Sequence, residues 1–297
     1  MVVAVILAFV SALGFASGSV LMRIGTQHVA PPVATFYTVL VGAILITSIA
    51  FAVNFDDIKT LPLEAYGWIT LMGILAYCIA RVLHNTALRM VGAARTVPMI
   101  SLQPLMAFAI GFLILQERPS LLVTIGTPVI AGGLMMVMLP RRRDAGAFEI
   151  RKLGYLLAFG GSLAFVTRDA ISRHVLGSLA LVPPFVASGF ALVFGGAILF
   201  ALIHRGVINS IRHQPMRYVG ICCIAGLLQG IAVASLFHAL SRADVTIVTP
   251  IYASQPIIAL VLASVFLRQL ESVDWLLAAG TVLSVAGVIL VILGATL

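Results

Sequence analysis

Residues 239–256 read ALSRADVTIVTPIYASQP, and residues 87–104, which lie 152 positions earlier, read ALRMVGAARTVPMISLQP. Both stretches begin with Ala-Leu, carry a proline at the twelfth position and end in Gln-Pro. The same order of residues at a fixed spacing is typical of a chain that contains two copies of one structural unit. These stretches therefore predict two related halves.

Further matches extend the repeat toward both ends of the chain. The matched pairs are Arg23 with Arg173, Pro31-Pro32 with Pro183-Pro184, Glu117 with Glu271, Gly126-Thr127 with Gly280-Thr281, and Gly133 with Gly287. We place the first repeat at residues 1–140, a basic linker at 141–152 and the second repeat at 153–297.

The composition indicates an integral membrane protein. The 297 residues are 61% hydrophobic and 9% charged, with a mean hydropathy of +1.15, whereas soluble domains are about half apolar and about a quarter charged. The net charge of +8 comes from basic residues scattered between apolar runs. This pattern indicates positively charged loops and not a nucleic-acid surface.

Nothing in the sequence predicts a metal site, a disulfide or a cofactor. Cys78, Cys222 and Cys223 lie inside apolar runs, and no Cys and His spacing typical of zinc occurs. The first apolar run has no basic residues before it, so we expect a true membrane span and not a cleaved signal peptide.

Ten apolar runs are long enough to cross a bilayer, whose core of about 30 Å takes about 20 helical residues. The runs cover residues 3–22, 32–53, 65–90, 95–115, 120–139, 153–175, 182–204, 216–240, 244–267 and 274–296. Each repeat then has five spans, and because five is odd the second repeat is upside down relative to the first. The predicted fold is all-α, with ten transmembrane helices in two inverted five-helix repeats.

Basic residues are distributed unequally between alternate loops, with 12 in the odd-numbered and 4 in the even-numbered loops. The positive-inside bias then puts the central linker in the cytoplasm and both termini outside.

The repeated motifs resemble the second part of an EamA repeat, from the drug/metabolite transporter superfamily. The family pattern of Ala-Leu, two prolines, a turn with glutamate and a glycine-rich helix is matched from Ala87 to Val137 and from Ala239 to Ile292. The second turn, Arg268 to Glu271, is two residues longer than the first. The resemblance implies a multi-pass metabolite carrier of the cell inner membrane and leaves its cargo open.

Polar residues of the third span indicate a binding face. Tyr77, Arg81, His84 and Asn85 follow one another at steps that keep them on one side of a helix. Arg81 lies near mid-span, where its guanidinium suits the carboxylate or phosphate of a substrate. The alternatives are an Arg81 that pairs with an aspartate and a His84 that serves packing and not proton transfer.

Arg168 and Asp169 are the other charged residues within a span. Because neighbouring helical positions point about 100° apart, we expect them to have separate partners. Asp169 is a candidate proton-coupling carboxylate. The alternative is a structural ion pair with Arg168, Arg173 or Arg81.

Gln103-Pro104 and Gln255-Pro256 stand at equivalent mid-span positions. Each proline predicts a helix kink with unpaired carbonyls, and the glutamine amides are candidates to line a cavity. The alternative is a pair of packing kinks that let helices move. Tyr252 adds a hydroxyl beside the second kink, and Gln229 corresponds to Tyr77 in the repeat.

The predicted function is secondary active transport of a small polar metabolite, an amino acid or small organic anion, by alternating access, with export favoured by the resemblance. A multidrug exporter of lipophilic cations that uses Asp169 is the alternative. A membrane-embedded enzyme is disfavoured because no HExxH or GxSxG motif is present, and a channel because no filter motif is. The expected partners are the substrate and the bilayer, and one copy of the chain suffices.

Overall fold

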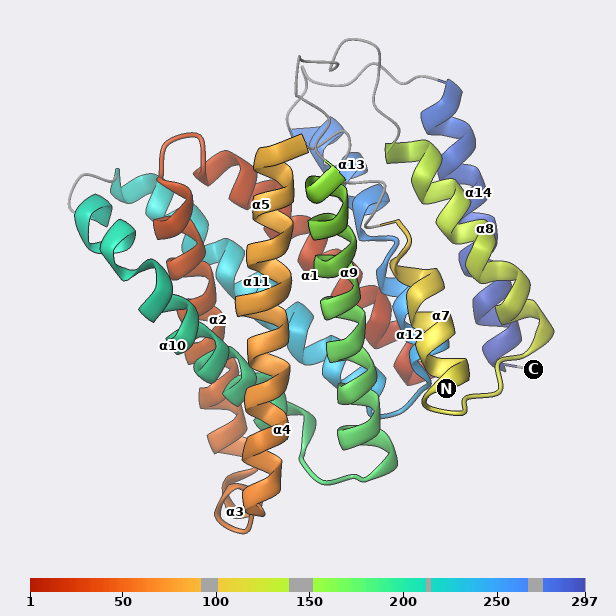
Figure 1. The fold of residues 1–297 in the computed structure, drawn as a ribbon, viewed down its shortest axis with the longest axis horizontal. Coiled ribbons are helices and arrows are strands. Elements are labelled where there is room, and N and C mark those ends of the chain that lie inside the picture. The colour runs from red at the N-terminus through yellow and green to blue at the C-terminus, as the bar shows by residue number, and fades with distance from the viewer. Residues whose placement is uncertain (92–100, 139–151, 212–214, 267–274, 297) are drawn as a thin grey trace.

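The computed structural model describes residues 1–91, 101–138, 152–211, 215–266 and 275–296, in which every regular element is a helix (Figure 1). Helices satisfy their own backbone hydrogen bonds, which is what a bilayer without water requires. The elements are α1 (Val2–Gly25), α2 (Pro31–Val53), α3 (Phe55–Lys59), α4 (Leu63–Gly73), η1 (Ile74–Ala80), α5 (Arg81–Val91), α7 (Gln103–Leu113), α8 (Leu121–Met138), α9 (Lys152–Arg173), η3 (His174–Ser178), α10 (Pro184–Ile211), α11 (Met216–Leu240), α12 (Val245–Tyr252), α13 (Gln255–Phe266) and α14 (Trp275–Thr296).

Among the described residues, six helices are long and apolar enough to cross a membrane, which agrees with a multi-pass protein. They cover Val2–Gly25, Val33–Val53, Leu63–His84, Pro184–Arg205, Met216–Leu240 and Ala279–Thr296. The third runs without a break from α4 through the π-helical segment η1 into α5. The apolar helices α7 and α8 are shorter, and α9 carries Arg168 and Asp169. The count of ten spans therefore stays a prediction.

Within the predicted span over residues 244–267, a turn at Ala253 and Ser254 separates α12 from α13, directly before Gln255-Pro256. Pro256 has no N–H to continue the hydrogen-bond ladder. The Ser254 hydroxyl donates to the carbonyl of Ile251 at 2.7 Å and so occupies a carbonyl at the end of α12.

Equivalent helices of the two halves pack against each other in opposite directions. Phe36 near the start of α2 contacts Phe200 near the end of α10, with ring centroids 5.0 Å apart. Phe51 near the end of α2 contacts Phe190 near the start of α10, at 6.1 Å. Ser120, just before α8, donates a hydrogen bond of 2.8 Å to the Gly294 carbonyl near the end of α14. Both pairs are therefore antiparallel.

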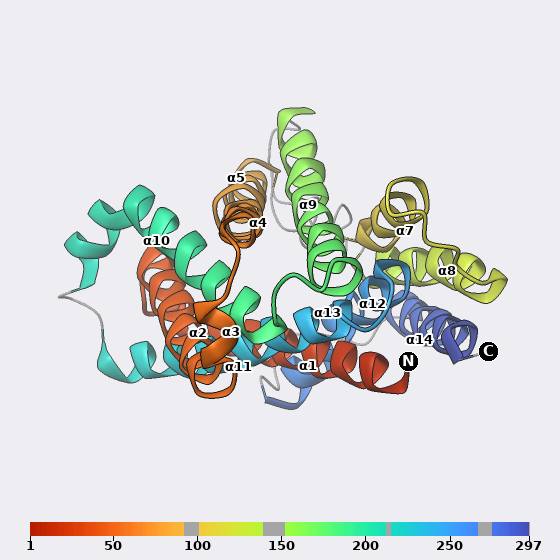
Figure 2. The same cartoon turned by 90° about the horizontal axis from the view of Figure 1, so that it is seen from below.

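Two further helix contacts between the halves have equivalents when the halves are exchanged. The contact of α1 with α11 corresponds to that of α9 with η1 and α5, and the contact of α1 with α13 corresponds to that of α9 with α7. Figure 2 shows α2 with α10 at one end of the bundle and α8 with α14 at the other. The two halves are thus related by an approximate twofold axis that passes between them.

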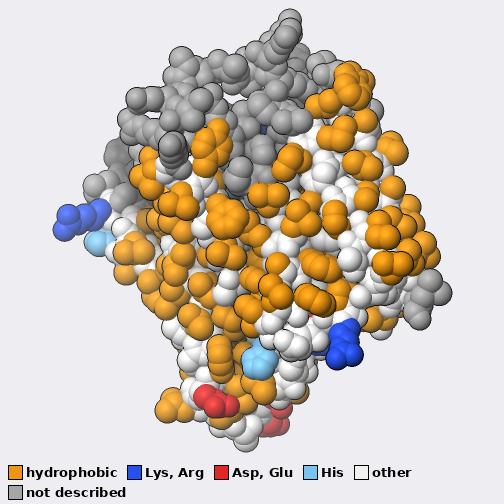
Figure 3. Space-filling view, turned by 45° about the vertical axis from the view of Figure 1, so that its right-hand side comes forward, with side chains coloured by type: hydrophobic (Ala, Val, Ile, Leu, Met, Phe, Trp, Pro, Cys, Tyr) orange, Lys and Arg blue, Asp and Glu red, His pale blue; other side chains and the backbone are white. Residues whose placement is uncertain are grey.

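The outer surface is suited to lipid. Hydrophobic side chains cover the face shown in Figure 3, and the few charged side chains visible there lie near its edges. Large apolar residues such as Ile44, Phe112 and Leu202 are more than half exposed. An apolar surface of this extent is unfavourable in water and favourable in a bilayer.

Small residues allow α8 and α14 to approach closely. A Cβ added to Gly133 would lie 2.5 Å from the Ser284 nitrogen and 2.7 Å from the Gly280 carbonyl oxygen. A Cβ added to Gly132 would meet nothing within 4 Å. Two neighbouring glycines of one helix thus have opposite environments.

We expect Gly133→Ala to destabilise the protein by about 1 to 3 kcal/mol, because overpacking forces the two backbones apart. Gly132→Ala is the matched control, and its better helix propensity makes it neutral or more stable by up to about 1 kcal/mol. Thermal unfolding in detergent measures both variants. Equal melting temperatures would contradict the close packing of α8 on α14.

Candidate functional site

A small polar cavity of about 60 Å³ lies at the centre of the bundle. Its walls come from α1, α2, η1, α5, α9, α10 and α11. The polar side chains that line it are Thr38, Tyr77, Arg81, Arg168 and Gln229. Because Tyr77 lies halfway along residues 63–91 and Gln229 lies near the middle of α11, the cavity is far from both ends of these helices.

The cavity lies on the approximate twofold axis. Tyr77 and Gln229 are 152 positions apart, as are the matched sequence motifs, and both line the cavity. Phe15 and Phe165 have the 150-residue spacing of Arg23 and Arg173, and they line it as well. By the same spacing Gly18 is the counterpart of Arg168, so the charge of Arg168 is not repeated in the other half.

Arg81 lines the cavity without an acidic partner in the part of the chain that the structure describes. Arg81 makes a cation–π interaction with the ring of Tyr77, with 5.8 Å from the guanidinium carbon to the ring centroid. This contact leaves the N–H groups of the guanidinium free to face an anion.

Arg168, Asp169 and Tyr252 form a buried network beside this cavity. The Nε of Arg168 lies 2.8 Å from Oδ1 of Asp169, and the Tyr252 hydroxyl donates to Oδ2 at 2.6 Å. Arg168 also interacts with Tyr252 and covers the ring of Phe237 at 5.7 Å. The expectation of separate partners is wrong, because the long arginine side chain reaches across the angle between neighbouring positions.

The two Gln-Pro pairs stand at helix starts and do not line this cavity. Pro104 lies in the first turn of α7 and Pro256 is the second residue of α13. A missing N–H costs nothing in a first turn, and each pair directly follows a turn, at residues 101–102 and 253–254. Gln103 is buried and Gln255 half-buried.

Of the predicted residues of the third span, His84 does not line the cavity. His84 is half-buried, and its backbone approaches Gly161 of α9. The side chain of Asn85 lies outside the part that the structure describes. The sequence analysis did not predict Phe15 and Phe165 as cavity residues, because an aromatic residue does not stand out within an apolar span. Their 150-residue spacing, which matches the repeat, was the one signal that could have identified them.

Glu117 joins the two halves at one end of the bundle. Its carboxylate accepts hydrogen bonds from the backbone N–H groups of Val245 at 2.9 Å and Thr246 at 3.0 Å, at the start of α12. Arg173 pairs with Asp244 at 2.8 Å and lies 4.0 Å from Glu117. Burial raises the pKa of the Glu117 carboxyl, and the two backbone hydrogen bonds partly offset this effect.

Comparisons with known proteins bear on the whole chain. A model of the EamA-like transporter family matches residues 2–139 and 152–293. Among curated proteins no match is found. A solved structure described as "Crystal structure of protein" is similar to 99% of this chain, over 97% of its own chain, with 21% sequence identity and a TM-score of 0.78. At this identity the likeness shows the fold alone.

We expect Tyr252→Phe to destabilise the protein by about 1 to 3 kcal/mol, because Oδ2 of the buried Asp169 loses its hydrogen bond. Tyr66→Phe is the matched control. The Tyr66 ring contacts Phe190, and its hydroxyl has no hydrogen bond among the described residues. Thermal unfolding in detergent compares the two, and an equal loss in both variants would refute the network.

Proposed function

The chain belongs to the EamA-like transporter family, and from this premise we propose that it is a secondary transporter of a small anionic or zwitterionic metabolite, an amino acid or organic acid, that works by alternating access. The proposal includes ten spans in two inverted repeats, a cytoplasmic linker at residues 141–152, a location in the cell inner membrane and net export. The antiparallel pairs α2 with α10 and α8 with α14 support the inverted arrangement.

One observation carries the choice of substrate, and it is the position of Arg81. A guanidinium inside a membrane protein without an acidic partner is costly, so such groups mark ligand pathways. Arg81 faces a cavity on the axis between the repeats, where a substrate would be reached from either side. Its fork of N–H donors matches a carboxylate.

The multidrug alternative needs a carboxylate that is free to bind a cation. Asp169 is the buried acid nearest to the cavity, and both of its oxygens have partners in Arg168 and Tyr252. A cation would have to displace the Arg168 guanidinium from it, which leaves a buried charge unpaired. The geometry therefore favours an anion at Arg81.

A ligand panel tests the substrate class. Amino acids, organic acids, nucleosides and quaternary amines are added to the purified protein, and the melting temperature is measured, because a ligand that binds only the folded state raises it. Stabilisation by amino acids or organic acids supports the proposal. Stabilisation by quaternary amines alone would contradict it and favour multidrug export through Asp169.

We expect Arg81→Ala to lower counterflow of the stabilising acid in proteoliposomes by about 10- to 150-fold, the equivalent of the 1.5 to 3 kcal/mol of a hydrogen bond to a charged group. Arg81→Lys keeps the charge without the fork, so we expect an intermediate rate. Arg217→Ala, which removes an exposed arginine at the start of α11, is the control. Counterflow that is equal in all variants at equal abundance would refute the anion site.

A further inference from the structure

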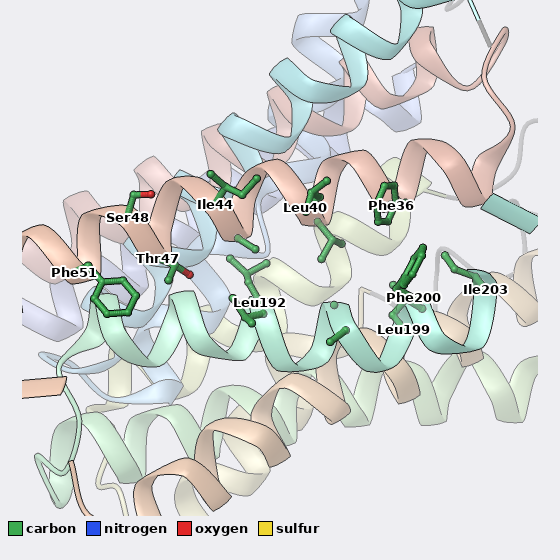
Figure 4. A pocket seen from close by; sticks show the side chains of 15 residues that line it. Phe36, Leu40, Ile44, Thr47, Ser48, Phe51, Leu192, Leu199, Phe200 and Ile203 are labelled. Carbon is green, nitrogen blue, oxygen red and sulfur yellow. The ribbon is translucent and has the colours of Figure 1, made fainter. Parts of the chain in front are cut away.

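An apolar groove of about 540 Å³ opens on the outer surface between α2 and α10. All of its lining residues come from these two helices (Figure 4). Apart from the hydroxyls of Thr47 and Ser48 near one end of the groove, these side chains are apolar. The volume lies in the range of pockets that hold a small organic ligand.

The groove adjoins the polar cavity. Val39 and Leu192 line both spaces, so the apolar groove and the cavity that contains Arg81 share these two side chains. The side chain of Val39 packs against the backbone of α10, because a Cβ added to Gly196 would lie 2.7 Å from Cγ1 of Val39. A ligand that occupied both spaces would have to displace the side chains of Val39 and Leu192.

The volumes of the cavity and the groove indicate which part of a ligand each of them would hold. The polar cavity of about 60 Å³ equals about two water molecules in liquid volume. A carboxylate fits this volume, and a long hydrocarbon chain does not. The adjoining space with room for such a chain is the apolar groove.

We propose that the groove and the cavity form one site for a long-chain carboxylic acid, whose carboxylate pairs with Arg81 and whose hydrocarbon chain lies between α2 and α10. The inference rests on the proposed anion site and assigns it an amphipathic acid in place of a small one. An acid with an apolar chain partitions into the bilayer, so it reaches the groove by lateral diffusion. Charge selects it over neutral lipid, because Arg81 lacks an acidic partner among the described residues.

The structure offers a matched pair of variants on α10. Ala197 is exposed and lines the groove, and Ala201, one turn further along the same helix, is exposed and does not line it. Ala197→Phe fills the groove without entering the core. Ala201→Phe adds the same side chain to the lipid-facing surface.

The test uses the full chain in lipid nanodiscs, because detergent chains compete for an apolar groove. A fatty acid with a diazirine in its chain is photolysed, and the labelled peptides are identified by mass spectrometry. We expect labelling of α2 and α10 that falls at least tenfold in Ala197→Phe and in Arg81→Ala and is unchanged in Ala201→Phe. The methyl ester of the probe, which lacks the charge, should label these helices at least tenfold less.

Equal labelling by the acid and its ester, or labelling that neither Ala197→Phe nor Arg81→Ala reduces, would overturn the inference, because the groove would then hold ordinary bilayer lipid. Counterflow of short acids that still depends on Arg81 in that case would leave the proposed function standing. If neither the labelling nor the counterflow of short acids depended on Arg81, the proposed anion site would be refuted as well.

Discussion

Close approach of helix backbones is the constraint on which the rest of the structure depends. Apolar side chains gain little by leaving lipid for one another, so helices in a membrane associate through packing at small residues. The contact of Gly42 with Gly230 and that of Gly73 with Gly195 leave no space for a Cβ. These contacts hold α11 against α2 and the α4–η1–α5 helix against α10, and so they fix the walls of the central cavity.

Charge breaks the symmetry that this packing creates. The shape of the cavity is repeated by Phe15 with Phe165 and by Tyr77 with Gln229, whereas Arg168 replaces a glycine position of the other half. Arg168 is neutralised by Asp169, so its role is to hold α9 and, through Tyr252, α12 together. The charge left for a ligand is that of Arg81, on the neighbouring helix α5.

The sequence predicted the fold class, the membrane setting and the repeat, because hydropathy and motif spacing are local patterns. It also singled out Tyr77, Arg81, Arg168 and Gln229, which line one cavity. Helical periodicity and the repeat offset identified these residues before any contact was known.

The features that the sequence did not predict depend on how far a side chain extends and on contacts between residues that are distant in the chain. The sequence left the pairing of Asp169 with Arg168 open as one alternative, because the length of the arginine side chain decides it and helical angles do not. A proline kink was predicted at Gln255-Pro256, but the hydrogen bond of Ser254 to the Ile251 carbonyl before it was not. Glu117 was recognised as a repeated residue, and its bonds to Val245 and Thr246, 128 and 129 positions away, were beyond any local pattern.

Glu117 also bears on how such a carrier would cycle. In alternating access an end opens when the contacts between repeats at that end break. Glu117 and the start of α12 form such a contact. Once that end is open, water can form hydrogen bonds with the carboxylate and with the two backbone N–H groups. Opening would then exchange internal hydrogen bonds for bonds to water, which costs far less than exposing them to lipid. The sequence repeats this glutamate as Glu271, which lies outside the residues that the structure describes.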